Sequence, residues 1–502
     1  MSRVINADIL IAGGGFSGSL LATILARHGM RVVLVERNRH PRFAIGESTT
    51  PTGNMAIRRI SEQYDLPFLL SLSAYGTWKE TYPGIACGSK RGFSYFFHEE
   101  DQPFAAFGDH RNELLVAANP DRERADTHWF RADVDAFLFE QAGRFGAVCM
   151  EETEIEEAVF DRLWSFRIRR ERVTETICAP LAFDASGRSS VIAKALQIPE
   201  HPSGLRTRSQ SLFGHFTDVT LWTDACPNLS TADHPFPCDE AALHHLFQGG
   251  WMWNLRFDNG ITSAGFMLAP NAASRSSREP ANGAREFRDR LNRLPTVRSA
   301  FENASPVRPI TATGELQFRR SRLAESHWAL LPASAYFLDP LHSTGLAHSL
   351  CCVERLAAMA LAHPDKRPAI AATYDTNVQC EIDLLDRIIH AGYASLHDPS
   401  RFLRSAMLYF FGATFTEHAA RAEPPLPTSF LHFHDPAFAD LIRAEHARLT
   451  HGIDPARRPN SSIGPCNSEG NEIEMERFAR RFQAYNKIGL CDPARRNMYP
   501  FL

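Results

Sequence analysis

The stretch Ile9-Leu10-Ile11-Ala12-Gly13-Gly14-Gly15-Phe16-Ser17-Gly18 decides the fold of this chain. Its four apolar residues predict a short strand buried inside a parallel sheet, and a G-x-G-x-x-G pattern follows directly. Apolar residues at helical spacing come next, up to Gly29, and a second apolar run, Val32–Val35, ends at Glu36. This order of strand, glycine turn, helix, strand and acidic residue is typical of a dinucleotide-binding unit.

Each glycine of this unit has a predicted task. Gly13 permits the tight turn, Gly15 lets the pyrophosphate approach the backbone, and Gly18 lets the helix pack on the strand. The phosphates then lie at the positive N-terminus of the helix, and Glu36 accepts a hydrogen bond from a ribose hydroxyl. An acid at this position favours FAD or NAD over NADP. We also predict that three neighbouring side chains contact the nucleotide: Phe16, Ser17 and Arg37.

The composition of the chain limits its function. Its 502 residues, enough for about three domains, are 44% hydrophobic and 22% charged, as in an ordinary globular protein. A net charge of -4 gives no bulk attraction to nucleic acid or to an anionic membrane. Four glycines interrupt the uncharged run from Ile9 to Ala26, so we expect no stable membrane insertion. Ten cysteines without a C-x-x-C pair predict a reduced, cytoplasmic chain, and we expect no metal site.

A second motif identifies the nucleotide as FAD. The segment Gly46-Glu47-Ser48-Thr49-Thr50-Pro51 resembles the G-E-S-x-x-P segment of the flavin-dependent halogenases, tryptophan and phenolic, within the single-component FAD monooxygenases. In that family the segment lines the flavin. The resemblance therefore implies FAD contacts from Gly46, Glu47 and Ser48.

Further family motifs follow in order along the chain. Arg131 matches an arginine that contacts the flavin nucleotide, and Asp184 lies in a D-A-S-G segment like the one in which the chain returns to the nucleotide domain. Asp339 begins a D-P-x-x-S-x-G segment, in which the aspartate lies near the ribityl chain. The resemblance implies that Ser343-Thr344-Gly345 borders the isoalloxazine ring and, in halogenases, the halide. Glycine-containing turns suit this task because their exposed N–H groups can hold an anion.

These motifs predict an α/β fold. We expect a Rossmann-like FAD-binding domain of the glutathione-reductase type, an inserted antiparallel β-sheet that forms the substrate layer, and a helical C-terminal region. Asp258-Asn259-Gly260 predicts a hairpin turn in the inserted sheet, and apolar residues from Ile382 to Ile389 have helical spacing. The predicted boundaries are 1–80, 128–200 and 310–363 for the FAD-binding domain, 81–127 and 201–309 for the substrate layer, and 364–502 for the helical region.

The resemblance also implies the chemistry. Reduced flavin and dioxygen form a C4a-hydroperoxide. In halogenases, chloride or bromide attacks it and a lysine carries the resulting hypohalous acid to an aromatic ring. Two lysines compete for this task, Lys79 and Lys90. We favour Lys90 because its segment resembles the lysine segment of the phenolic halogenases, and because Phe93 and Tyr95 alternate after it as on a strand beside a pocket. The alternative is a surface lysine at a strand end.

Two further places bear on the reaction. Trp251 and Trp253 match the halogenase W-x-W-x-I-P motif, which keeps the substrate away from the flavin, but Leu255 and Arg256 replace its isoleucine and proline. This change favours direct oxygen transfer to the substrate, unless the tryptophans are core residues whose loop has diverged. His342 is expected beside the flavin, where a histidine acts as a general acid or base or orients a phenol or indole N–H.

The main prediction is an FAD-dependent aromatic monooxygenase that hydroxylates a phenol or indole, either a small molecule or a residue of a peptide or carrier protein. The alternative is a halogenase of a phenol or indole that uses Lys90. More distant alternatives are a flavin-dependent double-bond reductase and a non-catalytic flavoprotein that binds a partner. No second glycine fingerprint is present for NAD(P)H, so either the nicotinamide docks transiently or a partner flavin reductase supplies the electrons.

Overall fold

A six-stranded sheet forms the base of the nucleotide-binding part, in a computed structural model that describes residues 3–201, 204–270, 280–422, 429–451 and 468–502. The strand order is β20-β21-β12-β2-β3-β8, and every pair except β20–β21 is parallel. The strands come from distant parts of the sequence: β2 (Ile9–Ala12), β3 (Val32–Val35), β8 (Val148–Met150), β12 (Leu181–Asp184), β20 (Ala324–Glu325) and β21 (Trp328–Leu330). The α/β fold and its Rossmann-like sheet are as predicted.

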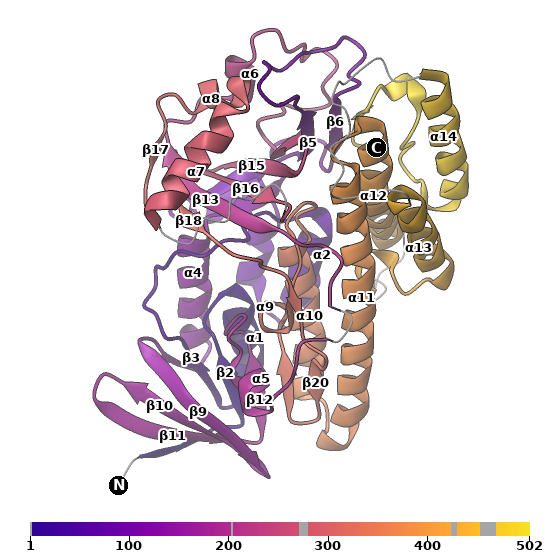
Figure 1. Ribbon diagram of the computed structural model, residues 1–502. Helices are drawn as coiled ribbons and strands as arrows, with labels where there is room; N and C mark the ends of the chain where they lie inside the picture. The colour runs from indigo at the N-terminus through magenta and orange to yellow at the C-terminus, as the bar shows by residue number, and fades with distance from the viewer. Residues whose placement is uncertain (1–2, 202–203, 271–279, 423–428, 452–467) are drawn as a thin grey trace.

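Helices complete this layer, and a smaller sheet lies beside it. Helix α1 (Phe16–Arg27) packs against α4 (Arg131–Arg144) and α10 (Thr344–Leu361), and α2 (Pro51–Gln63) packs on α10. A four-stranded sheet lies near the N-terminus (Figure 1). Its strands are β1 (Val4–Asn6), β9 (Thr153–Asp161), β10 (Leu163–Arg170) and β11 (Val173–Ala179).

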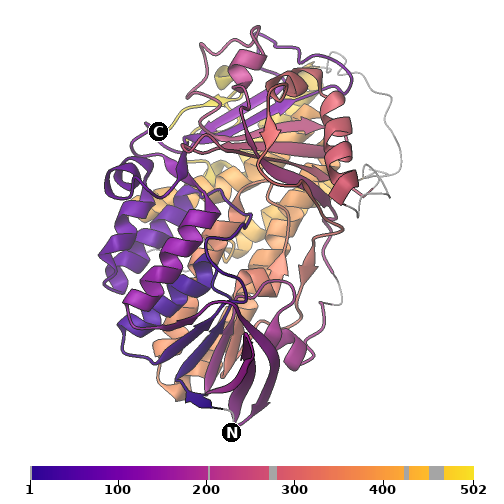
Figure 2. The ribbon, with the colours of Figure 1, turned by 90° about the vertical axis from the view of Figure 1, so that its left-hand side faces the viewer.

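A nine-stranded sheet lies above the nucleotide layer in both views (Figures 1 and 2). It is largely antiparallel, as predicted, but the pairs β5–β14 and β6–β23 are parallel. The hairpin at residues 257–261 joins β15 to β16, which confirms the predicted turn. The strands of the nine-stranded sheet are β5 (Gly92–Phe97), β6 (Glu113–Ala117), β13 (Gln210–Thr217), β14 (Ala242–Phe247), β15 (Gly250–Arg256), β16 (Thr262–Leu268), β17 (Ser305–Pro306), β18 (Thr311–Ala312) and β23 (Met498–Tyr499).

Both faces of the nine-stranded sheet are buried. One face, which carries Phe93, Tyr95 and Trp251, joins a hydrophobic core that runs through the nucleotide layer and the C-terminal helices. The other face, which carries Phe96 and Met252, packs in a separate core. The helices on that side are α6 (Trp222–Ala225), α7 (Pro280–Asn292) and α8 (Pro295–Ala300). Successive side chains of a strand point to opposite faces, so neighbouring residues enter different cores.

The C-terminal region is helical, as predicted. Its helices are α11 (Arg367–Ser395), α12 (Pro399–Ala422), α13 (Pro436–Thr450) and α14 (Ser468–Arg481). The long helices α11 and α12 extend along the side of both layers (Figure 1). After α14 the chain returns to the nine-stranded sheet, where β23 pairs with β6. Among the described residues, no helix is long and apolar enough to cross a membrane.

Short elements complete the described structure. They are α3 (Tyr75–Thr81), α5 (Val191–Ala195), α9 (Pro332–Ala335), β4 (Cys87–Lys90), β7 (Asp126–Trp129), β19 (Phe318–Arg319), β22 (Tyr336–Phe337) and the 3-10 helices Pro67–Ser73, Pro364–Lys366, Phe430–His432, Gln483–Tyr485 and Pro493–Arg495.

Candidate functional site

The turn between β2 and α1 is built as the glycine pattern predicts. Gly13 has a φ of +102°, and a Cβ atom there would collide with the carbonyl oxygen of Ala185. A Cβ atom at Gly18 would collide with the carbonyl oxygen of Gly13. The close approach of helix and strand therefore requires glycine at both positions.

A cavity of about 520 Å³ opens at the carboxyl ends of β2, β3 and β12. This is where open parallel sheets bind their ligands, and the volume lies in the range of small-molecule sites. Gly13, Glu36 and Arg37 line it, so the structure brings these predicted residues together. The loop after β12 lines the opposite side with Ala185, Ser186 and Gly187.

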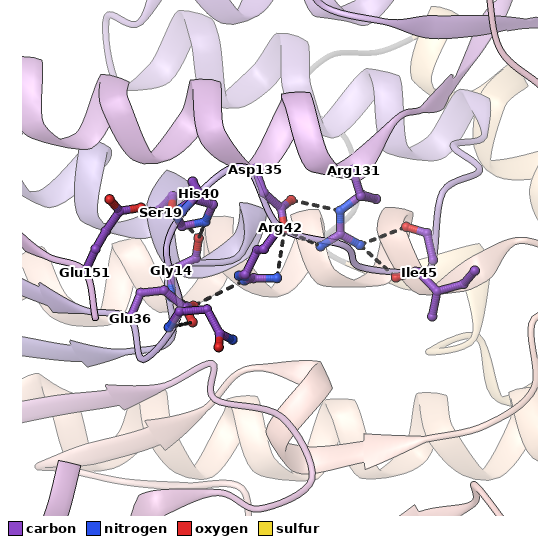
Figure 3. A network of polar contacts seen from close by, with 11 residues as sticks. Gly14, Ser19, Glu36, His40, Arg42, Ile45, Arg131, Asp135 and Glu151 are labelled. Carbon is purple, nitrogen blue, oxygen red and sulfur yellow. Dashed lines mark hydrogen bonds and ion pairs between the residues drawn. The ribbon is translucent and has the colours of Figure 1, made fainter. Parts of the chain in front are cut away.

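Glu36 is held in place at the edge of this cavity. One carboxylate oxygen accepts a hydrogen bond from the Gly14 N–H at 3.0 Å, and the other accepts one from the Asn38 N–H at 2.9 Å. Arg42 donates to Glu36 at 3.2 Å and lies 3.6 Å from Asp135 (Figure 3). Arg42 was not among the predicted site residues, although it lies in the loop just before the Gly46-Glu47-Ser48 motif.

Arg131 links α4 to the loop that carries Ile45 and Gly46 (Figure 3). It makes a bidentate pair with Asp135, at 2.8 and 3.0 Å, and donates to the carbonyl oxygens of Ile45 and Gly46, both at 2.9 Å. A Cβ atom at Gly15 would lie 3.4 Å from the Arg42 guanidinium and 3.9 Å from that of Arg131. Two arginines, together with the Asp135 carboxylate that pairs with both, thus lie at the N-terminus of α1, where a pyrophosphate would bind.

The residues of the Gly46-Glu47-Ser48 motif have three different environments. Gly46 is exposed and has a φ of +87°. The carboxylate of Glu47 lies 2.7 Å from His215 Nε2, so it is already paired within the protein. The Ser48 hydroxyl is buried and has no hydrogen-bond partner among the described residues. A buried hydroxyl without a hydrogen-bond partner, beside an exposed glycine, can form a hydrogen bond with a ligand.

Asp184 fixes the loop that borders the cavity. Its carboxylate accepts hydrogen bonds from the hydroxyls of Ser186, Ser190 and Ser334, at 2.6, 2.8 and 2.9 Å. It also accepts from the backbone N–H groups of Ser186 and Ile192. These five bonds occupy the carboxylate, so its contribution to a nucleotide site is to shape the loop.

Asp339 links the nucleotide layer to α11. It accepts hydrogen bonds from Ser209 Oγ at 2.8 Å and from the Tyr393 hydroxyl at 2.7 Å. The Trp251 indole N–H donates to the same Tyr393 hydroxyl at 3.2 Å. Burial raises the pKa of Asp339 to about 6, although its hydrogen bonds act in the opposite direction.

The Ser343-Thr344-Gly345 segment forms the start of α10. Ser343 adopts the left-handed conformation, with a φ of 53°, and the helix begins at Thr344. Gly345 is exposed although the residues on either side are buried, and no described atom lies within 4 Å of its Cβ position. The free N–H groups of a helix start therefore border an open space. This opening, the glycine turn and the Ser48 hydroxyl all fit FAD.

Lys90 is fully buried at the end of β4. This strand pairs with β7, and Lys90 lies opposite Asp126. The ammonium donates to the carbonyl oxygen of Thr49 at 2.6 Å and lies 4.0 Å from the centre of the Phe93 ring. Burial lowers the pKa of Lys90 and raises that of Asp126, because it disfavours both charged forms. The Asn54 side chain donates to Asp126 at 2.6 Å.

Lys79 lies in a different environment, on α3. Its side chain is 31% exposed and forms an ion pair with Asp258 at 2.5 Å. It has the solvent access and the acidic partner of an ordinary surface lysine. Of the two candidates, Lys90 alone is desolvated.

An aromatic cluster extends from Phe93, which contacts Lys90, to His342. Phe93 lies 5.7 Å from Tyr409, and Tyr409 stacks on His342 at 4.9 Å with nearly parallel rings. The members are Phe93, Tyr95, His244, Trp251, Trp253, His342, Phe402, Tyr409 and Phe410. Helix α12 supplies three of them, and the sequence analysis missed these and His244. A motif search could not find them, because residues 402–414 of α12 are almost all buried and no short motif separates those that face Lys90 from ordinary core residues.

His342 is buried within this cluster. Its Nδ1 lies 3.2 Å from the Tyr95 hydroxyl, and its Nε2 has no hydrogen-bond partner among the described residues. Burial, followed by the neighbouring His244, lowers the pKa of His342 to about 3. The imidazole is therefore neutral near pH 7. If Tyr95 donates to Nδ1, Nε2 carries the proton and is a free donor.

The two tryptophans are held on their strand. The Trp253 indole donates to Ser263 Oγ at 3.2 Å, and both rings lie in the core on the Lys90 side of the sheet. The Arg256 side chain donates instead to the carbonyl oxygens of Val219 and Thr220. It lies 3.7 Å from Asp239. Arg256 is thus engaged away from the tryptophans, contrary to the interpretation that it alters their barrier.

Comparisons with known proteins agree with this geometry. A family model described as tryptophan halogenase matches residues 127–405, and one described as FAD dependent oxidoreductase matches residues 8–165. Tetracycline 7-halogenase of Kitasatospora aureofaciens is 30% identical over 359 residues, which are 70% of this chain and 62% of that protein. Monodechloroaminopyrrolnitrin halogenase PrnC of Pseudomonas fluorescens is 29% identical, over 70% of this chain and 61% of that protein. The chain thus spans about three fifths of the length of these two relatives.

The crystal structure of halogenase PltM in complex with phloroglucinol and FAD has the same fold. Its TM-score is 0.84 at 23% sequence identity, and the match covers 98% of this chain and 99% of that chain. The family matches support FAD as the cofactor and an enzyme of the flavin-dependent oxidoreductase class. The matches favour halogenation, the alternative prediction, over hydroxylation, the main prediction. Because the tryptophan halogenase model covers more than half of its residues, this chain belongs to the tryptophan halogenase family.

Proposed function

We propose that this protein is a flavin-dependent halogenase of an electron-rich aromatic ring, with Lys90 as the halogen carrier. The observation that carries the proposal is a fully buried lysine among aromatic rings in a chain of the halogenase family. Hydroxylation loses its main support, because Arg256 points away from Trp251 and Trp253.

We infer that the nucleotide end holds FAD through backbone and cations together. Gly13, Gly15 and Gly18 bring the backbone close to the pyrophosphate, and Phe16 and Ser17 begin the helix that faces it. Arg42 and Arg131 neutralise its charge. Toward the other end of the cofactor lie Gly46, Ser48, Asp339, Ser343, Thr344 and Gly345. When bound and reduced, FAD would give two electrons to dioxygen, and the resulting peroxide-level oxygen would take two more from a halide to yield hypohalous acid.

Lys90 is suited to receive the halogen. An amine must be neutral to attack the halogen of hypohalous acid, and burial lowers the pKa of Lys90 toward that form. The nitrogen–halogen bond forms as the halogen–oxygen bond breaks, and the leaving hydroxide takes the proton that the amine loses to form water. An aromatic carbon then attacks the halogen, the amine leaves, and the ring loses a proton. Phe93 and Tyr95 exclude water from this amine, which protects the halogenated form from hydrolysis.

The neutral imidazole of His342 would orient the substrate. With Tyr95 on Nδ1, the Nε2–H group is free to donate to a halide or to a phenol oxygen. The tryptophans on β15 and the aromatic residues of α12 enclose the ring. These contacts suit a phenol or an indole, free or attached to a carrier protein.

The test is the mass of the product formed from full-length protein, FAD, dioxygen, bromide and an aromatic probe. Phloroglucinol and indole serve as probes, and a flavin reductase with NADH supplies electrons. We expect one bromine in place of one hydrogen. Addition of oxygen without bromine would support hydroxylation instead. Turnover without dioxygen would support a double-bond reductase. Omitting the reductase while keeping NADH tests whether the protein accepts electrons directly.

A further inference from the structure

Three ionisable side chains meet on the face of the nine-stranded sheet opposite the aromatic cluster. They are His110, just before β6, Glu113, the first residue of β6, and His234, in the loop before β14. Glu113 lies opposite Phe96 in the β5–β6 pair, and the His234 ring is 6.5 Å from the Phe96 ring. Phe96 belongs to the core on that second face. The cluster is therefore separate from the proposed reaction site.

The geometry of the cluster is that of a ligand set. One oxygen of Glu113 lies 3.4 Å from His110 Nδ1, and the other lies 3.0 Å from His234 Nε2. In a tetrahedral site with Zn–N and Zn–O bonds of about 2.1 Å, neighbouring ligand atoms are about 3.4 Å apart. The three side chains are no more than 2% exposed. All three ligand atoms lie within 4.8 Å of one another.

The hydrogen bonding around His110 supports ligation through Nδ1. That atom is buried and has no hydrogen-bond partner among the described residues. The other ring nitrogen, Nε2, lies 3.5 Å from the carboxylate of Asp233, which accepts a hydrogen bond from Arg496 at 2.6 Å. A carboxylate behind the distal nitrogen is the usual outer partner of a metal-bound histidine, because it fixes the tautomer and the ring.

We propose that His110, Glu113 and His234 bind one divalent transition-metal ion, zinc by the type of ligand. Two imidazoles and one carboxylate are ligands that Zn²⁺ accepts, and the fourth position is left to water. The ion tethers the loops that precede β6 and β14. Through Arg496 and Asn497, which donates to the His110 carbonyl oxygen at 3.1 Å, it also helps to fix the C-terminal strand β23. This tether is independent of the proposed halogenase function.

The first experiment measures zinc in untagged full-length protein purified without chelators, by inductively coupled plasma mass spectrometry. We expect about one zinc per chain. Removal with dipicolinate should lower the melting temperature, and stoichiometric Zn²⁺ should restore it. Absence of zinc, together with a melting temperature that neither dipicolinate nor added Zn²⁺ changes, would reduce the cluster to an ion pair and overturn the proposal. This comparison needs no variant, so a folding defect cannot obscure it.

Variants then test the ligands. Glu113→Gln keeps the shape of the side chain but removes the charge, and His234→Ala removes a ligand, so both should contain little zinc. His98→Gln is the control, because His98 is a buried histidine of the same layer, paired with His245 at 3.0 Å. It should keep its zinc. Equal zinc in all three variants would refute the assignment.

Asp233→Asn tests the outer partner. It should weaken zinc binding by about tenfold to a hundredfold without abolishing it. Competition with a chromogenic chelator measures this change. An affinity equal to that of the wild type would contradict ligation through His110 Nδ1. Halogenation by the zinc-depleted protein can be assayed separately, so failure of either proposal leaves the other testable.

Discussion

Charged side chains have opposite environments at two ends of the site. We call these the nucleotide end, around Arg42 and Arg131, and the lysine end, around Lys90. At the nucleotide end, Arg42, Arg131, Glu36 and Asp135 form a continuous network beside a cavity (Figure 3). At the lysine end, Lys90 is fully buried beside aromatic rings. Paired charges can hold a charged ligand, whereas burial shifts the pKa of an amine toward its neutral, reactive form. We therefore expect the nucleotide end to bind the cofactor and the lysine end to react.

The largest effect should come from Lys90→Met, which keeps the length of the side chain and removes the amine. We expect halogenation to fall by about 10³-fold or more, because the carrier nitrogen is lost. FAD binding should change little, since Lys90 lies outside the nucleotide network. Lys79→Met is the matched control and should keep most of the activity. The rate of bromination and an FAD titration measure the two effects. Similar activity in both variants would refute the assignment of Lys90.

His342→Phe should change how stability depends on pH. The folded-state pKa of His342, about 3, lies below the unfolded value of 6.5. The neutral imidazole therefore contributes stability that is present above pH 6.5 and is lost as the pH falls toward 3. Between pH 7 and 4.5 the wild type should lose about 2.5 kcal/mol relative to the variant. Urea unfolding at both pH values tests this. An equal change in both proteins would show that His342 is not the titrating group.

Arg131→Ala should weaken FAD binding at the opposite end of the site. We expect the dissociation constant to rise by about tenfold to a hundredfold, since one cation and the anchor of the Ile45–Gly46 loop are lost. Fluorescence quenching of FAD measures the constant. Arg124→Ala, which breaks only an exposed pair with Asp121, is the control and should bind FAD like the wild type. If its effect equalled that of Arg131→Ala, general electrostatics would explain both.

The smallest effect should come from Arg256→Met. Because its guanidinium is bound to the carbonyl oxygens of Val219 and Thr220, we expect less than about a twofold change in the ratio of brominated to oxygenated product. Mass spectrometry of the product mixture measures the ratio. A strong shift toward bromination or oxygenation would revive the interpretation that this residue controls the tryptophan barrier.

Much of the nucleotide site could be predicted because its rules are local. The glycines at 13, 15 and 18 serve a turn whose geometry the sequence encodes within ten residues. Arg42 was missed because no short sequence pattern indicates which nearby arginine lies beside Asp135. Tyr409 and Phe410 were missed for a stronger reason. They lie more than 300 residues from Lys90 in the sequence, and only the packing of α12 brings them beside Phe93.

The sequence by itself determined the cofactor class, the resemblance to halogenases and Lys90 as a candidate, because each rests on a short motif with a local physical task. Only the tertiary structure shows that Lys90 is buried and Lys79 partly exposed, since burial depends on residues distant in the sequence. It also decided that Arg256 points away from the tryptophans and that His110, Glu113 and His234 meet. Side-chain direction and desolvation are properties of the packed molecule, which no single stretch of sequence contains.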